Sequence, residues 1–143
     1  MLILLPIFLG FYLAWEPNIP ANTAAELAEA TKCDIGNMTA WAHRNIEYEK
    51  GYGWGSAERV LASGKANCVG YSNLYRETLR KCGYYTRVQI LSNGKPVNHA
   101  VTLFQAPDGR RGFVNQDDYK IYDKATAWDE VIAGVSGGPW KAE

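Results

Sequence analysis

The sequence predicts an α+β protein in which N-terminal helices pack on a small antiparallel β-meander. Between residues 23 and 82, apolar side chains recur every three or four positions, as they do on the buried face of a helix. After Gly83 apolar and polar residues alternate instead, which is typical of strands. Tight-turn signals separate the alternating segments, so we expect consecutive strands to be joined by hairpins.

Four helices are expected before Gly83. Thr23 and Glu26 form a capping box, because each side chain can accept a hydrogen bond from a free backbone N–H at the helix start, and this first helix runs to about Lys32. The other three are expected at residues 38–48, between Ser56 as the cap and Gly64 as the terminator, and at residues 67–81.

The fourth of these helices places Cys68 in its first turn. A mainly apolar stripe runs along one face of residues 67–82, and Arg76, Arg80 and Lys81 lie largely off it. Cys68 is the first member of the stripe. The helix dipole and the free N–H groups at a helix N-terminus favour the thiolate form of a cysteine there.

Three strands are expected after Gly83, at residues 85–91, 97–105 and 111–116. Asn93-Gly94 and residues 106–109 (APDG) are the turn signals between them. On the middle strand His99, Val101 and Leu103 share one face, which we take as the core side. A last helix is expected to start near Thr126 and to cover residues 128–133.

Composition restricts the class of protein. The 143 residues contain 15 basic and 15 acidic side chains, and no basic block that would bind phosphates, which argues against a nucleic-acid partner. Beyond the N-terminus no apolar stretch is long enough to span a bilayer. The three cysteines and two histidines form no zinc-binding motif, and we expect neither a metal nor an organic cofactor.

The N-terminal residues 1–15 carry no charge and are expected to be a signal or membrane-anchor segment. Residues 16–22 are the expected linker, and residues 23–143 the catalytic domain. The protein would then be exported or tethered to a membrane, on the periplasmic or extracellular side. The alternative is a cytoplasmic protein in which residues 1–15 form a buried element.

A histidine on the strand could act as the base for Cys68, and an Asn or Asp on the next strand could orient it. A three-residue loop at residues 106–108 would make His99 face Asn115. A two-residue turn at 108–109 would bring Asp118 opposite instead, and the sequence does not fix this register.

Residues 61–83 (LASGKANCVGYSNLYRETLRKCG) resemble the nucleophile segment of transglutaminase-like cysteine proteins: small residues, the cysteine, an amphipathic helix and a closing glycine before a strand. Residues 98–101 (NHAV) and 112–115 (GFVN) resemble the second and third blocks of that superfamily. The resemblance implies a papain-like core of the bacterial transglutaminase-like cysteine peptidase type. It assigns Cys68 as nucleophile, His99 as base and Asn115 as the orienting residue, with Asp117 and Asp118 as alternatives to Asn115.

The implied reaction is cysteine-dependent acyl transfer on the amide bonds of a protein or peptide, foremost hydrolysis of peptide or isopeptide bonds through a thioester. Protein cross-linking by an amine acceptor and an inactive binding or scaffold module are the alternatives. Trp54, in a glycine-rich loop, is a candidate for oxyanion support. Cys33 and Cys82 are expected to form a disulfide in an exported protein, because the helices next to them would pack side by side, and to be buried thiols otherwise.

Overall fold

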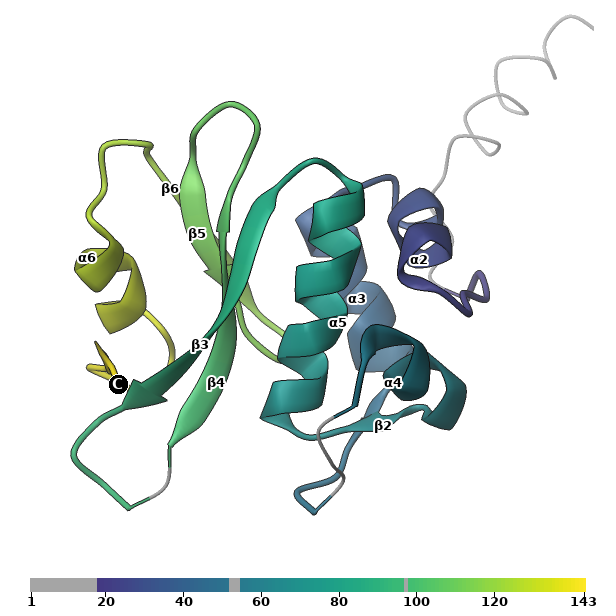
Figure 1. The fold of residues 1–143 in the computed structure, drawn as a ribbon, viewed down its shortest axis with the longest axis horizontal. Coiled ribbons are helices and arrows are strands. Elements are labelled where there is room, and N and C mark those ends of the chain that lie inside the picture. Colours follow the sequence, from purple (N-terminus) through teal and green to yellow (C-terminus); the bar gives the residue numbers. More distant parts are fainter. Residues whose placement is uncertain (1–17, 52–54, 97) are drawn as a thin grey trace, which may run out of the picture.

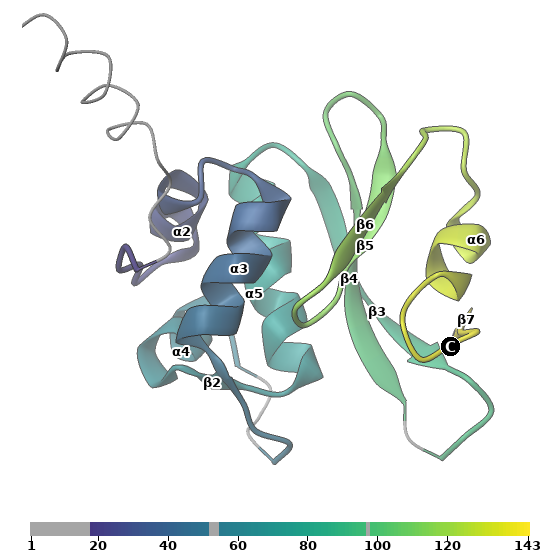
Figure 2. The same cartoon turned by 180° about the vertical axis from the view of Figure 1, so that it is seen from behind.

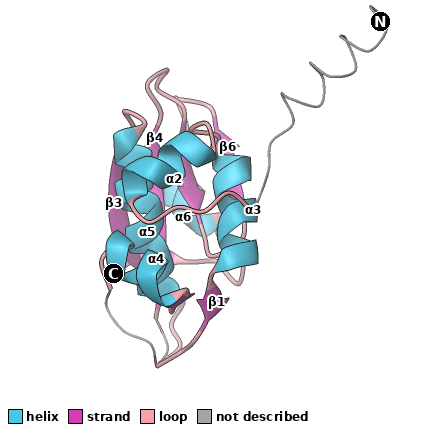
Figure 3. Ribbon diagram, turned by 90° about the vertical axis from the view of Figure 1, so that its right-hand side faces the viewer, coloured by secondary structure: helices cyan, strands magenta, loops and turns pink. Residues whose placement is uncertain are grey.

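The computed structural model describes residues 18–51, 55–96 and 98–143, whose elements form three layers (Figure 1). A sheet lies in the middle, with one helix, α6 (Trp128–Ala133), on one face. Figures 2 and 3 show the other helices gathered on the opposite face of the sheet. These helices are α2 (Ala24–Ala30), α3 (Ile35–Asn45), α4 (Ala57–Ser63) and α5 (Cys68–Lys81).

The main sheet is antiparallel and has five strands in the order β6-β5-β4-β3-β7. These are β3 (Tyr85–Ser92), β4 (His99–Gln105), β5 (Arg111–Val114), β6 (Tyr119–Tyr122) and β7 (Lys141–Ala142). The expected α+β fold is therefore confirmed, but the sequence predicted only the three central strands. The edge strand β7 has only two residues, too few for an alternating pattern, and the four residues of β6 (YKIY) are mostly exposed and do not alternate strictly.

The helices begin where the sequence places their caps. Thr23, Ser56 and Asn67 each accept a hydrogen bond from the backbone N–H three residues further along. The second helix is the exception: Asp34 caps it and it spans Ile35–Asn45, so it begins and ends three residues before the expected range of 38–48. The chain is extended from there and forms β1 (Glu47–Tyr48), which pairs in parallel with β2 (Lys65–Ala66).

The central strand β4 is buried on both faces, which corrects its interpretation as a strand with one core side. Phe104 belongs to the apolar core beneath the four N-terminal helices, and the Thr102 hydroxyl donates to the Ser72 carbonyl of α5 at 2.7 Å. Val101 and Leu103 belong to a second core with α6. The face that His99 shares with them is thus the face covered by α6. Alternation alone could not show which of the two buried faces of β4 this is.

A disulfide joins Cys33, at the turn after α2, to Cys82, at the end of α5, with 5.7 Å between the two Cα atoms. Cys68 is the free cysteine. Residues 18–22, expected as a linker, lie against α3, since the Trp41 indole donates to the Ile19 carbonyl at 2.8 Å. Residues 1–15 are outside the described residues. Among the described helices, none is long and apolar enough to cross a bilayer.

Candidate active site

Cys68 is the first residue of α5 and lies half-buried at the edge of a cavity of about 570 Å³. The Asn67 side chain accepts from the Gly70 N–H at 3.0 Å, and the Ser72 hydroxyl donates to the Cys68 carbonyl at 2.8 Å. Gly70 has to lack a side chain, because a Cβ there would lie 2.7 Å from the Cβ of Ala66. The helix start is therefore held closely against β2.

The pairing of β4 with β5 has neither of the two registers expected from the sequence. The hairpin loop consists of residues 107–109. The backbone N–H of Ala106 donates to the Arg110 carbonyl at 2.8 Å, and Gln105 is paired with Arg111. Gly109 supplies the positive φ of +91° that such a loop needs. A sequence cannot fix which residues close a hairpin when several turn-forming residues adjoin each other.

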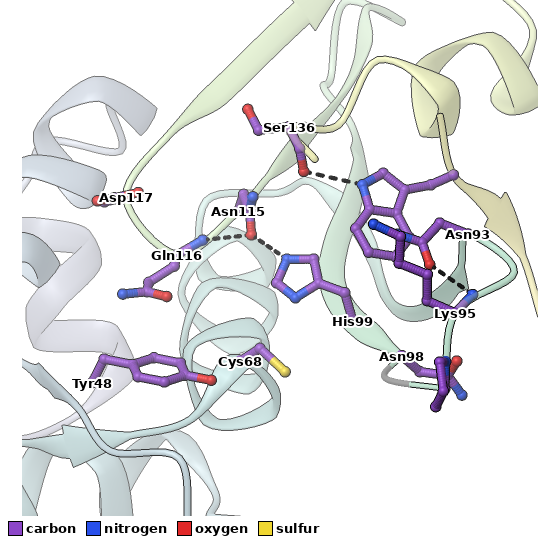
Figure 4. A pocket seen from close by; sticks show the side chains of 12 residues that line it. Tyr48, Cys68, Asn93, Lys95, Asn98, His99, Asn115, Gln116, Asp117 and Ser136 are labelled. Carbon is purple, nitrogen blue, oxygen red and sulfur yellow. Dashed lines mark hydrogen bonds between the residues drawn. The ribbon is translucent and has the colours of Figure 1, made fainter. Parts of the chain in front are cut away.

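His99 and Asn115 meet diagonally across this hairpin rather than face to face. The ladder stops at Thr102 opposite Val114, and extending its register would put Asn115 opposite Val101. Diagonal neighbours two residues away lie on the same face and are within reach of a long side chain. His99 Nε2 is 2.7 Å from Asn115 Oδ1 (Figure 4).

The hydrogen bonds of Asn115 define the tautomer of His99. The Asn115 Oδ1 atom also accepts from the backbone N–H of Gln116 at 2.9 Å, which identifies that atom as the amide oxygen. Nε2 of His99 must therefore carry the proton that it donates to Asn115. The other ring nitrogen, Nδ1, is then the basic one in the neutral imidazole.

The thiol and the imidazole shift each other's pKa. The hydrogen bond to His99 lowers the pKa of Cys68, outweighing partial burial, which acts in the opposite direction. The same hydrogen bond raises the pKa of His99, again against its burial. Both shifts favour a thiolate beside an imidazolium.

Tyr48 is a site residue that the sequence analysis missed. Its partner in the β1–β2 pair is Ala66, two residues before Cys68, and Figure 4 shows its hydroxyl directed toward Cys68. Burial, and secondarily the charge of Cys68, raises the pKa of Tyr48, so its hydroxyl remains a hydrogen-bond donor at neutral pH. A two-residue strand gives no periodic signal, which is why Tyr48 was assigned to the preceding helix.

Trp140, next to β7, forms another wall of the site. Its ring centre lies 5.7 Å from that of His99, and its indole N–H donates to the Ser136 carbonyl at 3.0 Å. An aromatic side chain in this position limits the rotation of the imidazole ring and the access of water to it. No sequence motif connected Trp140 with His99, because β7 reaches β3 only through the fold.

The alternatives to Asn115 have other partners. Asp117 lines the cavity, but its carboxylate lies 3.8 Å from His43 Nδ1. Asp118 accepts a hydrogen bond from the Ser136 hydroxyl at 3.0 Å. Trp54 lies outside the described residues. Within the described part of the chain, no three His, Cys, Asp or Glu side chains gather as metal ligands would.

A helix-start thiol beside a strand histidine, in an α+β domain of this topology, defines the class of cysteine proteins with a papain-like core. The sequence pattern of the transglutaminase-like superfamily core matches residues 21–140, and the chain belongs to that superfamily. No curated protein and no solved structure matches the chain. Membership is consistent with cysteine-dependent acyl transfer on amides without specifying the reaction.

Proposed function

We propose that this protein hydrolyses peptide or isopeptide bonds through a thioester on Cys68. The observation that carries the proposal is the arrangement of Cys68, His99 and Asn115 in one cavity. The imidazole is hydrogen-bonded to Asn115 and lowers the pKa of the thiol, and the thiol raises the pKa of the imidazole. An inactive scaffold would have no need for this pairing of a thiolate with an imidazolium.

In the acylation step, the Cys68 thiolate attacks the amide carbonyl carbon and forms a tetrahedral intermediate. His99, protonated on both nitrogens, then gives its Nδ1 proton to the amine nitrogen as the C–N bond breaks. The amine leaves, and the acyl group stays on sulfur as a thioester. Asn115 accepts from Nε2 throughout, so the same nitrogen always faces the reaction.

The oxyanion of the tetrahedral intermediate requires two hydrogen-bond donors. The backbone N–H of Cys68 lies in the first turn of α5, where amides have no partner within the helix. The Tyr48 hydroxyl is the second donor, since it lines the same cavity and points toward Cys68 (Figure 4).

In the deacylation step, neutral His99 removes a proton from water through Nδ1, and the hydroxide attacks the thioester carbonyl carbon. The C–S bond then breaks, which releases the acid and restores the Cys68 thiolate beside protonated His99. An amine in place of water would give a cross-linked product. Mass spectrometry of the products of a peptide substrate, with and without added amine, distinguishes the two outcomes.

The first test is the pH dependence of alkylation by iodoacetamide, followed by peptide mapping to Cys68. Because the pKa of Cys68 is lowered, the midpoint of the alkylation curve should lie below the pKa of about 8.5 that is ordinary for a cysteine. His99→Ala should shift the curve to higher pH. An ordinary titration curve that His99→Ala leaves unchanged would refute the proposed function.

We also propose that the protein acts outside the cytosol, cleaved from or tethered by residues 1–15. The Cys33–Cys82 disulfide supports this, because such bonds persist in oxidising compartments. Fractionation of cells that express the full chain tests the proposal, and recovery of the domain from the cytosol with both thiols reduced would contradict it.

A further inference from the structure

Two cavities open onto the nucleophile, and they differ in charge. Cys68, Asn98 and His99 line both of them. The larger cavity also has one side chain of each charge, Lys95 and Asp117. The second cavity, of about 470 Å³, is completed by Val69, Ile90, Ala100 and Glu143. Glu143 is the only acidic side chain that lines this second cavity in the described residues, and none of its lining residues is a lysine or arginine.

Glu143 is held in place at its backbone and at its carboxylate. Its backbone N–H donates to the Ile90 carbonyl at 3.1 Å, next to the pairing of β7 with β3. The Asn98 amide donates to Glu143 Oε2 at 2.5 Å, and Asn98 directly precedes His99. The negative charge thus occupies a defined position beside the catalytic histidine.

The lining of the second cavity changes from apolar to anionic. Val69, Ile90 and Ala100 supply aliphatic surface to the cavity that the thiol and Glu143 also line. The Cys68–His99 pair has no net charge as thiolate and imidazolium, so Glu143 sets the net charge of the cavity at neutral pH. An aliphatic stem with a cationic end group complements both parts of such a surface.

We propose that this second cavity is a substrate subsite for a positively charged side chain, of the lysine or arginine class, next to the scissile amide. The proposal rests on the proposed function and adds substrate specificity to it. The bound group is recognised rather than consumed. A carboxylate partner stabilises the protonated form of an amine, and a protonated amine cannot attack a thioester.

The test compares three methanethiosulfonate reagents of similar size that bear a trimethylammonium group, no charge, or a sulfonate. Each reacts with the thiolate to form a mixed disulfide and releases methanesulfinate. Because Cys33 and Cys82 are bonded to each other, Cys68 is the reacting thiol. The measured quantity is the rate constant of the cationic reagent divided by that of the neutral one, which cancels changes in the reactivity of the thiol itself.

We expect Glu143→Gln to lower this ratio about two- to fivefold, the size of a partly exposed charge interaction, and to raise the corresponding ratio for the sulfonate. Glu143→Lys should lower the ratio for the cationic reagent further and raise the ratio for the sulfonate further. Glu29→Gln, which removes an exposed charge from α2, is the matched control and should change neither. Ratios that stay constant in both Glu143 variants, or that change equally in the control, would overturn the proposal.

This measurement is independent of turnover, since it requires only an accessible thiol. An ordinary thiol pKa would refute the proposed function and leave the charge ratio interpretable. For an active enzyme, a peptide library provides the second readout. Wild-type protein should favour Lys or Arg at one position beside the cleaved bond, and Glu143→Gln should lose that preference while still cleaving uncharged sequences.

Discussion

At the scale of single residues, the site depends on the orientation of one imidazole ring. Asn115 holds Nε2, Trp140 lies beside the ring, and the thiol is left with Nδ1. The Tyr75 hydroxyl donates to the Gln116 carbonyl at 2.6 Å, so a buried side chain of α5 also fixes the turn that presents Asn115. Two predictions belong to this scale.

Asn115→Ala should reduce kcat by about 100-fold, because the imidazole loses the acceptor that selects its tautomer. Circular dichroism should show an unchanged fold, since Asn115 is only half-buried. Asp117→Ala and Asp118→Ala are the controls and should retain activity near that of the wild type. If either aspartate variant loses activity while Asn115→Ala keeps it, the assignment of the orienting residue is wrong.

Tyr48→Phe should lower kcat by about 100-fold with little change in KM, because an oxyanion donor acts mainly in the transition state. The alkylation rate of Cys68 should change little, since alkylation by iodoacetamide forms no oxyanion. Tyr85→Phe removes a hydroxyl from an exposed residue on β3 and serves as the matched control. Equal losses in the two variants would exclude a specific role for Tyr48.

At the scale of elements, the nucleophile is positioned by the start of α5. The buried residues of this helix, Tyr71, Leu74 and Tyr75 among them, anchor it in the core beneath the N-terminal helices. Its first turn is held by the Asn67 cap and by the close approach of Gly70 to Ala66. The reactivity of the thiol is therefore coupled to the integrity of this turn.

Asn67→Ala should lower the free energy of unfolding by about 1 kcal/mol, the usual effect of removing an N-cap. It should also slow alkylation of Cys68 at neutral pH about twofold or more, since the helix-dipole contribution is about 0.3–1 kcal/mol. Ser56→Ala removes the cap of α4 and should cost similar stability without affecting the thiol. Urea titration and alkylation kinetics of both variants check this, and equal thiol effects would contradict it.

At the scale of the whole molecule, the disulfide separates a structural pair of cysteines from the reactive one. Cys82 follows α5 and Cys68 begins it, so the two lie about 20 Å apart along a 14-residue helix. The bridge also ties the turn after α2 to the central helix. It can stabilise the fold without contacting the site.

The double variant Cys33→Ser/Cys82→Ser should be about 4 kcal/mol less stable than the oxidised protein on the chain-entropy model, given the sequence separation of 49 residues. Urea unfolding measures this loss. In conditions where the variant remains folded, its Cys68 alkylation rate should equal that of the wild type.

The mass of the non-reduced wild-type protein should indicate one bridge and one free thiol. Three free thiols, or a bridge that includes Cys68, would contradict the pairing.

Features that depend on neighbouring residues could be predicted from the sequence. Capping side chains and apolar spacing identified the helices, and they placed Cys68 at the start of one of them. Alternation and turn residues identified the three central strands. These signals are local, because a cap or an amphipathic stripe stabilises its element wherever the rest of the chain lies.

The distant side chains that surround the thiol could not be predicted in this way, because the fold brings them together. The β4–β5 register depended on the closing pair of the hairpin, and it made His99 and Asn115 diagonal neighbours. Tyr48 reaches the site through β1, whose partner β2 also has only two residues, and Glu143 follows the two-residue strand β7, which pairs with the edge of β3. Such pairings gain their free energy from contacts between remote segments, so no local pattern in the sequence can specify them.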